Sequence, residues 1–359
     1  MSDDDRAPTF AEQLHSSLAE RLVGAMPEPA VAVDLEGRAI VANKPAFVLL
    51  PGLKLGEPLI LALRSPDVID AMRRVLASGE AETAPWSERV PIERLFEVCV
   101  APLEGASGAV AAALLTLRDL TEQRRLERMR VDFIANASHE LRTPLASMLG
   151  FIETLQGSAH GDAKARDKFL VIMREQGRRM ARLIDDLLSL SRIEQKQHVL
   201  PEAAVDLAQL ARHVADTLAP LAREMGVEIK IAADRPVTVT GDRDELLRVA
   251  ENLIENAIKY GARQDGSSAD RVEITVQRTA SEGSLVVRDF GRGIAPEHLP
   301  RLTERFYRVD LSQSRAKNGT GLGLAIVKHI LTRHRGRLTI ASGLDRGSTF
   351  TAIVPLHRD

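Results

Sequence analysis

A histidine followed directly by a carboxylate is the clearest sign of chemistry in this chain. His139 and Glu140 lie in a segment whose apolar residues recur in steps of three and four, the spacing of one helix face. His139 is two residues from both Ala137 and Leu141, which is about 200° around a helix from that face. We therefore expect the imidazole to point to solvent, where it could act as a nucleophile near neutral pH.

Pro144 stands five residues after His139. A proline there removes a helical N–H and clashes with the carbonyl of Glu140, so we expect the helix to bend or loosen. A bent helix with an outward imidazole suits a nucleophile that meets a mobile partner. The alternative is that His139 is a solvated surface histidine and that Pro144 ends the helix.

A second group of polar residues follows one face of a predicted helix. Asn252, Asn256, Lys259 and Tyr260 are spaced i, i+4, i+7 and i+8. Asparagine is a poor helix former, so two on one face call for a reason. Carboxamide oxygens suit Mg²⁺ and a lysine suits a phosphate, although a solvated polar face would have the same pattern.

Two glycine-containing segments could hold the rest of a nucleotide. Asp289 follows a predicted strand over 285–288, and its carboxylate could accept a hydrogen bond from an amine such as that of adenine, while Gly291 and Gly293 would let backbone approach the ring. The segment 319–324 precedes a predicted helix, and its glycines there would form an anion site. Its Gly-x-Gly-x-Gly spacing fits neither the dinucleotide fingerprint nor the Walker loop. The residues between, 305–308 and a polar stretch to Asn318, are predicted to form a mobile lid, and 347–350 to form a turn into the last strand.

Long helices must position His139. The apolar spacing predicts two amphipathic helices, over 120–156 and 164–195, joined by a turn at 157–161. Asp119 and Glu122 fit a capping box at the start of the first. Two helices alone cannot bury both apolar stripes, so we expect a homodimer through residues 120–200 that forms a four-helix bundle.

The flanking regions read as two mixed domains. Residues 1–17 are expected to be a tail or a lead-in helix, and 18–119 an α+β domain with a hairpin over 30–43, a helix near 66–79 and strands near 84–91, 94–102 and 109–118. Residues 201–359 are expected to form an α/β sandwich. The fold class is therefore multi-domain.

Composition limits the possible functions. The chain has 359 residues, which suggests two or three domains, and a net charge of −2, so no basic field indicates nucleic-acid binding. The single cysteine, Cys99, excludes an intrachain disulfide framework. The best apolar run, 109–117, is far shorter than the roughly 20 residues of a membrane span. We expect a cytoplasmic protein, or the soluble portion of a membrane-anchored one.

The motifs and their order along the chain resemble those of the sensor histidine kinases of bacterial two-component systems. The resemblance covers nearly the whole chain. The segment around His139 is similar to their H box, 252–260 to the N box, 289–293 to the first glycine box, 305–308 to the F box and 319–323 to the second glycine box. Residues 20–119 resemble a PAS sensor module. The phosphate-responsive kinases are the subgroup that we suggest. The chain departs from the family at Thr303, where a phenylalanine is usual, which affects the packing at the base of the lid.

The resemblance implies a reaction and a set of roles. His139 would be phosphorylated by ATP with Glu140 as general base, and the phosphoryl group would pass to an aspartate of a response regulator; Thr143 would orient water in a reverse, phosphatase reaction. Asp289 would hold adenine, and Asn256, assisted by Asn252, would hold Mg²⁺. The other positions implied at the nucleotide are Lys259, Tyr260, Gly291, Gly293, Arg305, Arg308, Gly319, Thr320, Gly321, Leu322 and Gly323.

Two other functions are compatible with parts of the pattern. An ATP-driven clamp or repair ATPase would share the nucleotide motifs but needs no exposed histidine, and a non-catalytic scaffold would only dimerise and bind partners. The sequence does not identify the stimulus that residues 20–119 would sense. Aromatic residues make up 3% of the chain, which leaves little stacking surface for a flavin. A module that binds no ligand fits the sequence as well as a small-molecule sensor does.

Overall fold

The computed structural model describes residues 20–88, 94–105, 107–157, 160, 162–196, 198–261, 270–309 and 319–357. They belong to two compact units, one up to Asp132 and one from Phe133 onward. The tail or lead-in helix expected at 1–17 and the polar part of the expected lid, 310–318, lie outside the described residues. The domain boundaries expected near 119 and 200 stay predictions.

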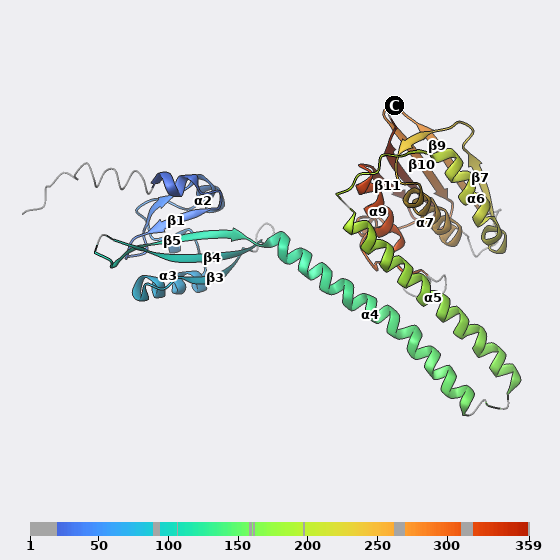
Figure 1. The fold of residues 1–359 in the computed structure, drawn as a ribbon, viewed down its shortest axis with the longest axis horizontal. Helices are drawn as coiled ribbons and strands as arrows, with labels where there is room; N and C mark the ends of the chain where they lie inside the picture. Colours follow the sequence, from blue (N-terminus) through green and yellow to red (C-terminus); the bar gives the residue numbers. More distant parts are fainter. Residues whose placement is uncertain are drawn as a thin grey trace, which may run out of the picture. The chain divides into compact units, whose positions relative to one another are not determined.

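The first unit contains a five-stranded antiparallel sheet of order β2-β1-β5-β4-β3 (Figure 1). Its strands are β1 (Ala30–Val33), β2 (Ala39–Ala42), β3 (Glu82–Glu88), β4 (Arg94–Glu104) and β5 (Val110–Asp119). Its helices are α2 (Lys44–Leu49), η1 (Leu59–Leu61) and α3 (Pro66–Ser78). The predicted hairpin is confirmed, because β1 and β2 pair across a turn in which Gly37 has a φ of 76°. The end of the strand expected near 84–91 lies outside the described residues.

Two long helices follow, as the apolar spacing predicted: α4 (Thr121–Gln156) and α5 (Ala163–Gln195). The Asp119 carboxylate accepts the Thr121 amide at the start of α4, and Asp162 accepts the Ala165 amide at the start of α5. The α4 helix continues through Pro144 without a break, so Pro144 does not end it.

The apolar stripes of the two helices are buried to different degrees. On α5, Leu183 and Leu190 are 3% and 1% exposed and belong to the core of the C-terminal sandwich in the same unit. On α4, Leu145 and Ile152 are 46% and 36% exposed within the single chain. The sequence assigned both stripes to a helical bundle, and half of the α5 stripe instead packs on the neighbouring sandwich.

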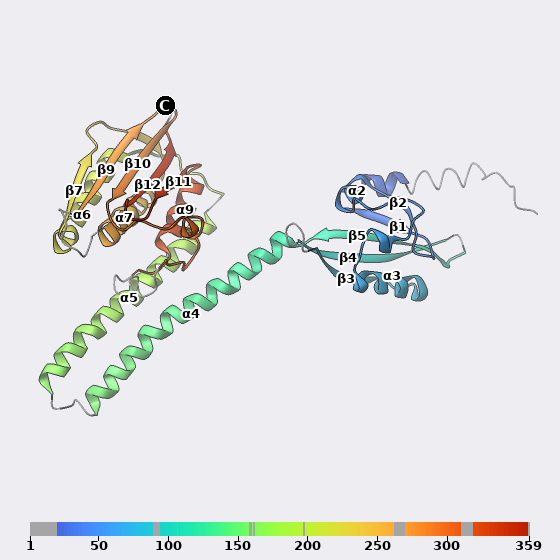
Figure 2. The same ribbon diagram turned by 180° about the vertical axis from the view of Figure 1, so that it is seen from behind.

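The C-terminal part is an α/β sandwich, as predicted. Its described strands have the order β11-β12-β10-β9-β7; β7 pairs with β9 in parallel and the other three pairs are antiparallel. The helices pack on one face of this sheet (Figure 1). Figure 2 shows these strands from the other side. The sheet strands are β7 (Val227–Ala232), β9 (Asp270–Arg278), β10 (Glu282–Asp289), β11 (Arg337–Ser342) and β12 (Ser348–Pro355). The helices are α6 (Leu207–Glu224), α7 (Arg243–Gly261), η2 (Pro296–Arg301) and α9 (Gly323–Arg333), and a small ribbon is formed by β6 (Ala204–Asp206) and β8 (Thr238–Thr240).

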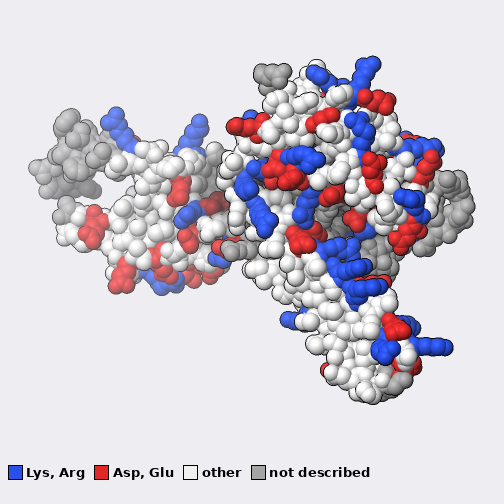
Figure 3. Space-filling model, turned by 45° about the vertical axis from the view of Figure 1, so that its right-hand side comes forward, with Lys and Arg blue, Asp and Glu red and all other residues white. Residues whose placement is uncertain are grey.

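The surface agrees with the composition. Acidic and basic side chains are interspersed over the face drawn in Figure 3, as the net charge of −2 leads us to expect. Among the described residues, no helix combines the length and apolar character needed to cross a membrane.

Candidate active site

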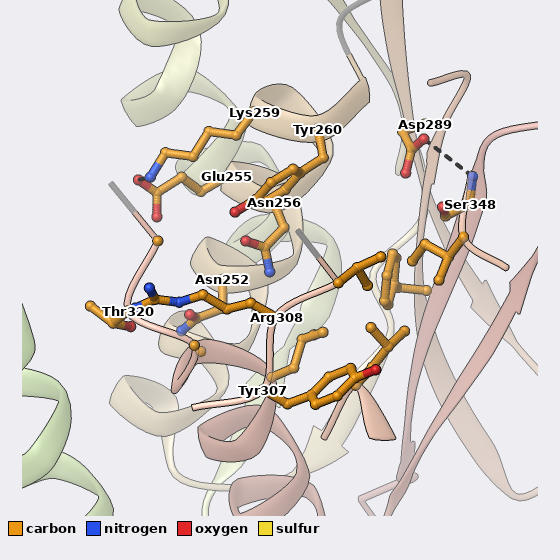
Figure 4. Close-up of a pocket in the computed structure, with 18 of the residues that line it drawn as sticks. Asn252, Glu255, Asn256, Lys259, Tyr260, Asp289, Tyr307, Arg308, Thr320 and Ser348 are labelled. Atoms are coloured by element: carbon orange, nitrogen blue, oxygen red, sulfur yellow. Dashed lines mark hydrogen bonds and ion pairs between the residues drawn. The ribbon is translucent and has the colours of Figure 1, made fainter. Parts of the chain in front are cut away.

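A cavity of about 600 Å³ lies in the sandwich between α7, the end of β10 and the segment before α9 (Figure 4). Its size is that of a small-molecule site. The predicted residues that line it are Asn252, Asn256, Lys259, Tyr260, Asp289, Gly293, Arg308, Gly319, Thr320, Gly321 and Gly323. Gly291, Arg305 and Leu322 are not part of this lining.

The polar face of α7 forms one wall. Figure 4 shows Asn252, Asn256, Lys259 and Tyr260 rising from this helix along one side of the cavity. Asn252 donates through Nδ2 to the carbonyl of Arg248 at 2.8 Å, and Lys259 pairs with Glu255 at 2.7 Å. The Lys259 side chain is only 13% exposed. The amphipathic helix buries its other face in the core, which fixes these polar groups toward the cavity.

Asp289 ends β10 and is 5% exposed. Its Oδ1 accepts the amide N–H groups of Gly291 at 3.0 Å and of Ser348 at 3.2 Å. Burial raises the pKa of this carboxyl, and the hydrogen bonds from Gly291 and Ser348 partly offset that effect. Two strand ends of the sheet therefore hold one carboxylate at the wall of the cavity.

The glycines around Asp289 are required by close backbone contacts. A Cβ on Gly291 would lie 2.5 Å from the carbonyl oxygen of Tyr260, and one on Gly293 would lie 1.9 Å from that of Gly343. Gly293 also has a φ of 68°, which other residues rarely adopt. Gly291 thus acts by packing beside the cavity rather than by lining it.

The second glycine segment leads into α9. Gly321 has a φ of 74°, and a Cβ there would lie 2.9 Å from the backbone of Phe306. A Cβ on Gly323 would lie 2.3 Å from Oδ1 of Asn252. The Leu322 side chain is fully buried in the core, so it anchors the loop, and its amide N–H bonds to Thr320 Oγ1 at 3.3 Å.

The long helix α5 supplies a wall that the sequence did not predict. Arg182, Asp185 and Asp186 line the cavity, with Arg248 of α7. Asp186 accepts from Arg248 at 2.8 Å and from Thr320 Oγ1 at 2.8 Å. Nothing in the local sequence marks these residues, because their role depends on the packing of α5 against the sandwich.

The two arginines of the 305–308 segment are both engaged with the long helices. Arg305 forms an ion pair with Glu194 of α5 and lies over the Phe133 ring. The Arg308 side chain is 3% exposed and pairs with Glu140 of α4 at 2.9 Å. Its Nε is buried and has no hydrogen-bond partner among the described residues. A buried guanidinium with an unused donor fits a site for an anionic ligand.

The expected exposure of His139 is confirmed. No hydrogen bond to its imidazole is found within the described part of the chain. Thr143 Oγ1 donates to the carbonyl of His139 at 3.2 Å, so this hydroxyl is used within α4. Glu140 is half-buried and holds two arginines, Arg179 at 3.0 Å and Arg308 at 2.9 Å.

Comparison with protein families agrees with these features. Residues 23–125 match the PAS fold, 129–196 the His Kinase A (phospho-acceptor) domain, and 241–358 the histidine kinase-, DNA gyrase B- and HSP90-like ATPases. The chain has the domains of a sensor histidine kinase. The resemblance seen in the motifs and the predicted multi-domain fold class are confirmed.

Individual relatives are also sensor proteins. The phosphate regulon sensor protein PhoR of Pseudomonas aeruginosa is 41% identical over 240 residues, which are 66% of this chain and 53% of PhoR. Sensor protein SrrB of Staphylococcus aureus is 28% identical over 356 residues, 99% of this chain and 58% of SrrB. The chain therefore spans little more than half the length of these curated relatives.

A solved structure supports the arrangement of elements. The histidine kinase ThkA, in its complex with the response regulator protein TrrA, matches with a TM-score of 0.52 and 21% identity, covering 94% of this chain and 98% of that chain. At this level of identity the likeness concerns the fold.

Proposed function

We propose that this chain is an ATP-dependent protein histidine kinase. It transfers the γ-phosphoryl group of ATP to His139 and then passes it to an aspartate of a separate response regulator. The observation that carries the proposal is the cavity, which gathers a helix face, a strand end and a glycine loop from three distant segments. The same compact unit exposes a histidine on α4.

Asp289 is our candidate for adenine recognition. A buried carboxylate held by two amide N–H groups has a fixed direction, and it can accept a hydrogen bond from the exocyclic amine of adenine. The absence of side chains at Gly291 and Gly293 keeps the backbone packed closely behind it. We place Tyr260 beside the base, on the neighbouring helix face.

Asn256, with Asn252 beside it, is our candidate for holding Mg²⁺ through carboxamide oxygens. The metal would neutralise part of the triphosphate charge. Lys259, Arg308 and the amide N–H groups around Gly321 would bind the phosphates. The unused Nε donor of Arg308 supports this assignment, because a phosphate oxygen would satisfy it. Gly319, Thr320 and Gly323 complete the proposed phosphate end, whereas Arg305 lies outside the cavity lining and pairs with Glu194.

The proposed reaction needs His139 as nucleophile and Glu140 as base. An imidazole nitrogen attacks the γ-phosphorus in line, the bond from phosphorus to the ADP oxygen breaks, and the ring proton passes to the Glu140 carboxylate. In the structure Glu140 is held by the Nη atoms of Arg308, and in our proposal this ion pair opens when the whole guanidinium turns to the phosphates.

The exposed apolar side chains of α4 support a homodimer through residues 120–200. Leu126, Met129, Leu145 and Leu149 are each at least 44% exposed in the single chain. A second copy would cover them in a four-helix bundle. The molar mass in solution tests this part, and a monomer at micromolar concentration would contradict it.

A response regulator is the proposed partner, and Thr143 the proposed residue for orienting water in the reverse reaction. Since ATP is the phosphoryl donor, we place these domains on the cytoplasmic side. The 41% identity to PhoR supports the phosphate-responsive subgroup, which phosphotransfer profiling against the regulators of the source organism would test.

Incubation with γ-labelled ATP tests the main proposal. We expect label on the protein that is acid-labile and base-stable, and that is lost in His139→Gln. An ATP-driven clamp would hydrolyse ATP without such a label. A scaffold would bind no ATP through this cavity, so unchanged ATP binding in Asp289→Asn would favour it.

A further inference from the structure

Glu140 is held by two arginines that come from different parts of the unit. Arg179 lies on α5, within the same helical stem as Glu140, and Arg308 lies in the sandwich. Both side chains are well buried, with 13% and 3% exposed. An ion pair at this depth is less screened by water than a surface pair.

The two carboxylate oxygens of Glu140 are used unequally. Oε2 accepts from Arg179 Nη2 at 3.0 Å and from Arg308 Nη2 at 2.9 Å. Within the described part of the chain, Oε1 has only the long contact of 3.5 Å with Arg308 Nη1. When Arg308 leaves, the bond from Arg179 to Oε2 remains and Oε1 becomes free.

We propose that Arg179 is a positioning residue for the general base. It holds Oε2 of Glu140 after Arg308 has moved to the nucleotide, so that Oε1 is the oxygen that takes the imidazole proton. The proposal rests on the function proposed above and adds to it a residue that lies outside the motifs.

The geometry also explains why an arginine suits position 179. A glutamate side chain has several rotamers, and fixing one of them requires a rigid partner. The guanidinium is a planar fork that holds a carboxylate oxygen in a set direction, whereas an ammonium is a point charge on a flexible stem. Arg179→Lys should therefore restore only part of the function of Arg179.

The kinetics of His139 phosphorylation in the full chain provide the test. Since Arg179 is not among the residues that line the cavity, Arg179→Gln should lower kcat while leaving KM for ATP within about twofold. We expect kcat to fall roughly tenfold or more, because misplacing a catalytic group by about 1 Å can cost up to a hundredfold. Arg179→Lys should lie between this variant and the wild type.

Arg178→Gln is the matched control. It removes the same charge one residue away on the same helix, and Arg178 is exposed with no ion pair among the described residues. We expect wild-type kinetics. Equal losses in Arg178→Gln and Arg179→Gln would overturn the proposal, and so would a rise in kcat in Arg179→Gln.

A double-mutant cycle with Glu140→Gln separates positioning from a structural role. If Arg179 acts through Glu140, adding Arg179→Gln to Glu140→Gln should lower kcat by less than about twofold further. A full additional loss, or a parallel loss of thermal stability and ATP binding, would contradict the proposal. If the wild type carries no label on His139, the proposed function itself fails. If the wild type is labelled and the Arg179 variants show the same kinetics as the wild type, the function stands and this inference falls.

Discussion

Replacing Gly323 by alanine should weaken ATP binding without unfolding the protein. A Cβ at Gly323 would lie 2.3 Å from Oδ1 of Asn252, whereas ordinary contacts begin near 3.4 Å. The Asn252 carboxamide must therefore move by about 1 Å or rotate. Gly323 is the first residue of α9 and has no positive φ, so alanine is compatible with its backbone.

The expected magnitudes follow from the two contacts that change. Moving Asn252 disturbs its 2.8 Å hydrogen bond to the Arg248 carbonyl, which costs about 1 kcal/mol. Alanine in place of glycine at a helical position stabilises the folded state by about 1 kcal/mol at most, which offsets this cost. The free energy of unfolding should thus change little. Hydrogen bonds to charged groups contribute about 1.5–3 kcal/mol, so losing the contact of Asn252 with the metal–nucleotide complex should weaken binding tenfold or more.

Titration of the full chain with an ATP analogue, together with thermal melting, measures both quantities. Gly177→Ala on α5 is the matched control, because a Cβ there meets nothing within 4 Å. It should leave ATP binding unchanged and raise stability slightly. Wild-type affinity in Gly323→Ala would refute the placement of Asn252 at the nucleotide.

Three further results are expected. Burial raises the pKa of Asp289 above the ordinary 3.8, and adenosine binding should weaken as the pH falls through this raised pKa. Adenosine titrations between pH 7 and 4 measure the effect. Unchanged adenosine binding in Asp289→Asn would contradict it. Burial lowers the pKa of His334 below the ordinary 6.5, so as the pH falls the unfolded chain binds the proton before the folded chain does. The free energy of unfolding should therefore fall by up to about 1.4 kcal/mol per pH unit below pH 6.5. Urea unfolding at several pH values measures this slope, which should be smaller in His334→Gln. Glu140→Gln removes a carboxylate that competes for Arg308, so ATP should bind about fivefold or more tightly by calorimetry, and weaker binding would count against the competition.

Periodicity alone was sufficient to predict the long helices and the polar face of α7. Helix faces repeat every 3.6 residues, and the expected ranges 120–156 and 164–195 differ from α4 and α5 by one residue at most. The nucleotide motifs could be grouped because each carries a local requirement, such as the close backbone contacts at Gly291 and Gly293.

The partners of the buried faces could not be predicted. An apolar stripe shows that a face is buried but not what covers it, and the sequence assigned Leu190 to a helical bundle although it packs in the core of the sandwich. Asp186 reaches the cavity only because α5 packs there. The pairing of Glu140 with Arg308 joins residues 168 positions apart, and neither residue type indicates the other.

Two contacts between the long helices and the sandwich each occupy a residue that the proposed reaction needs. Arg308 is held by Glu140, and Thr320 by Asp186. A nucleotide that takes Arg308 and Thr320 must break these contacts, so each lost contact lowers the apparent affinity for ATP. By linkage, ATP must loosen the sandwich from the helices by the same free energy. Movement of the sandwich toward His139 and filling of the cavity are therefore coupled through this ion pair and this hydrogen bond.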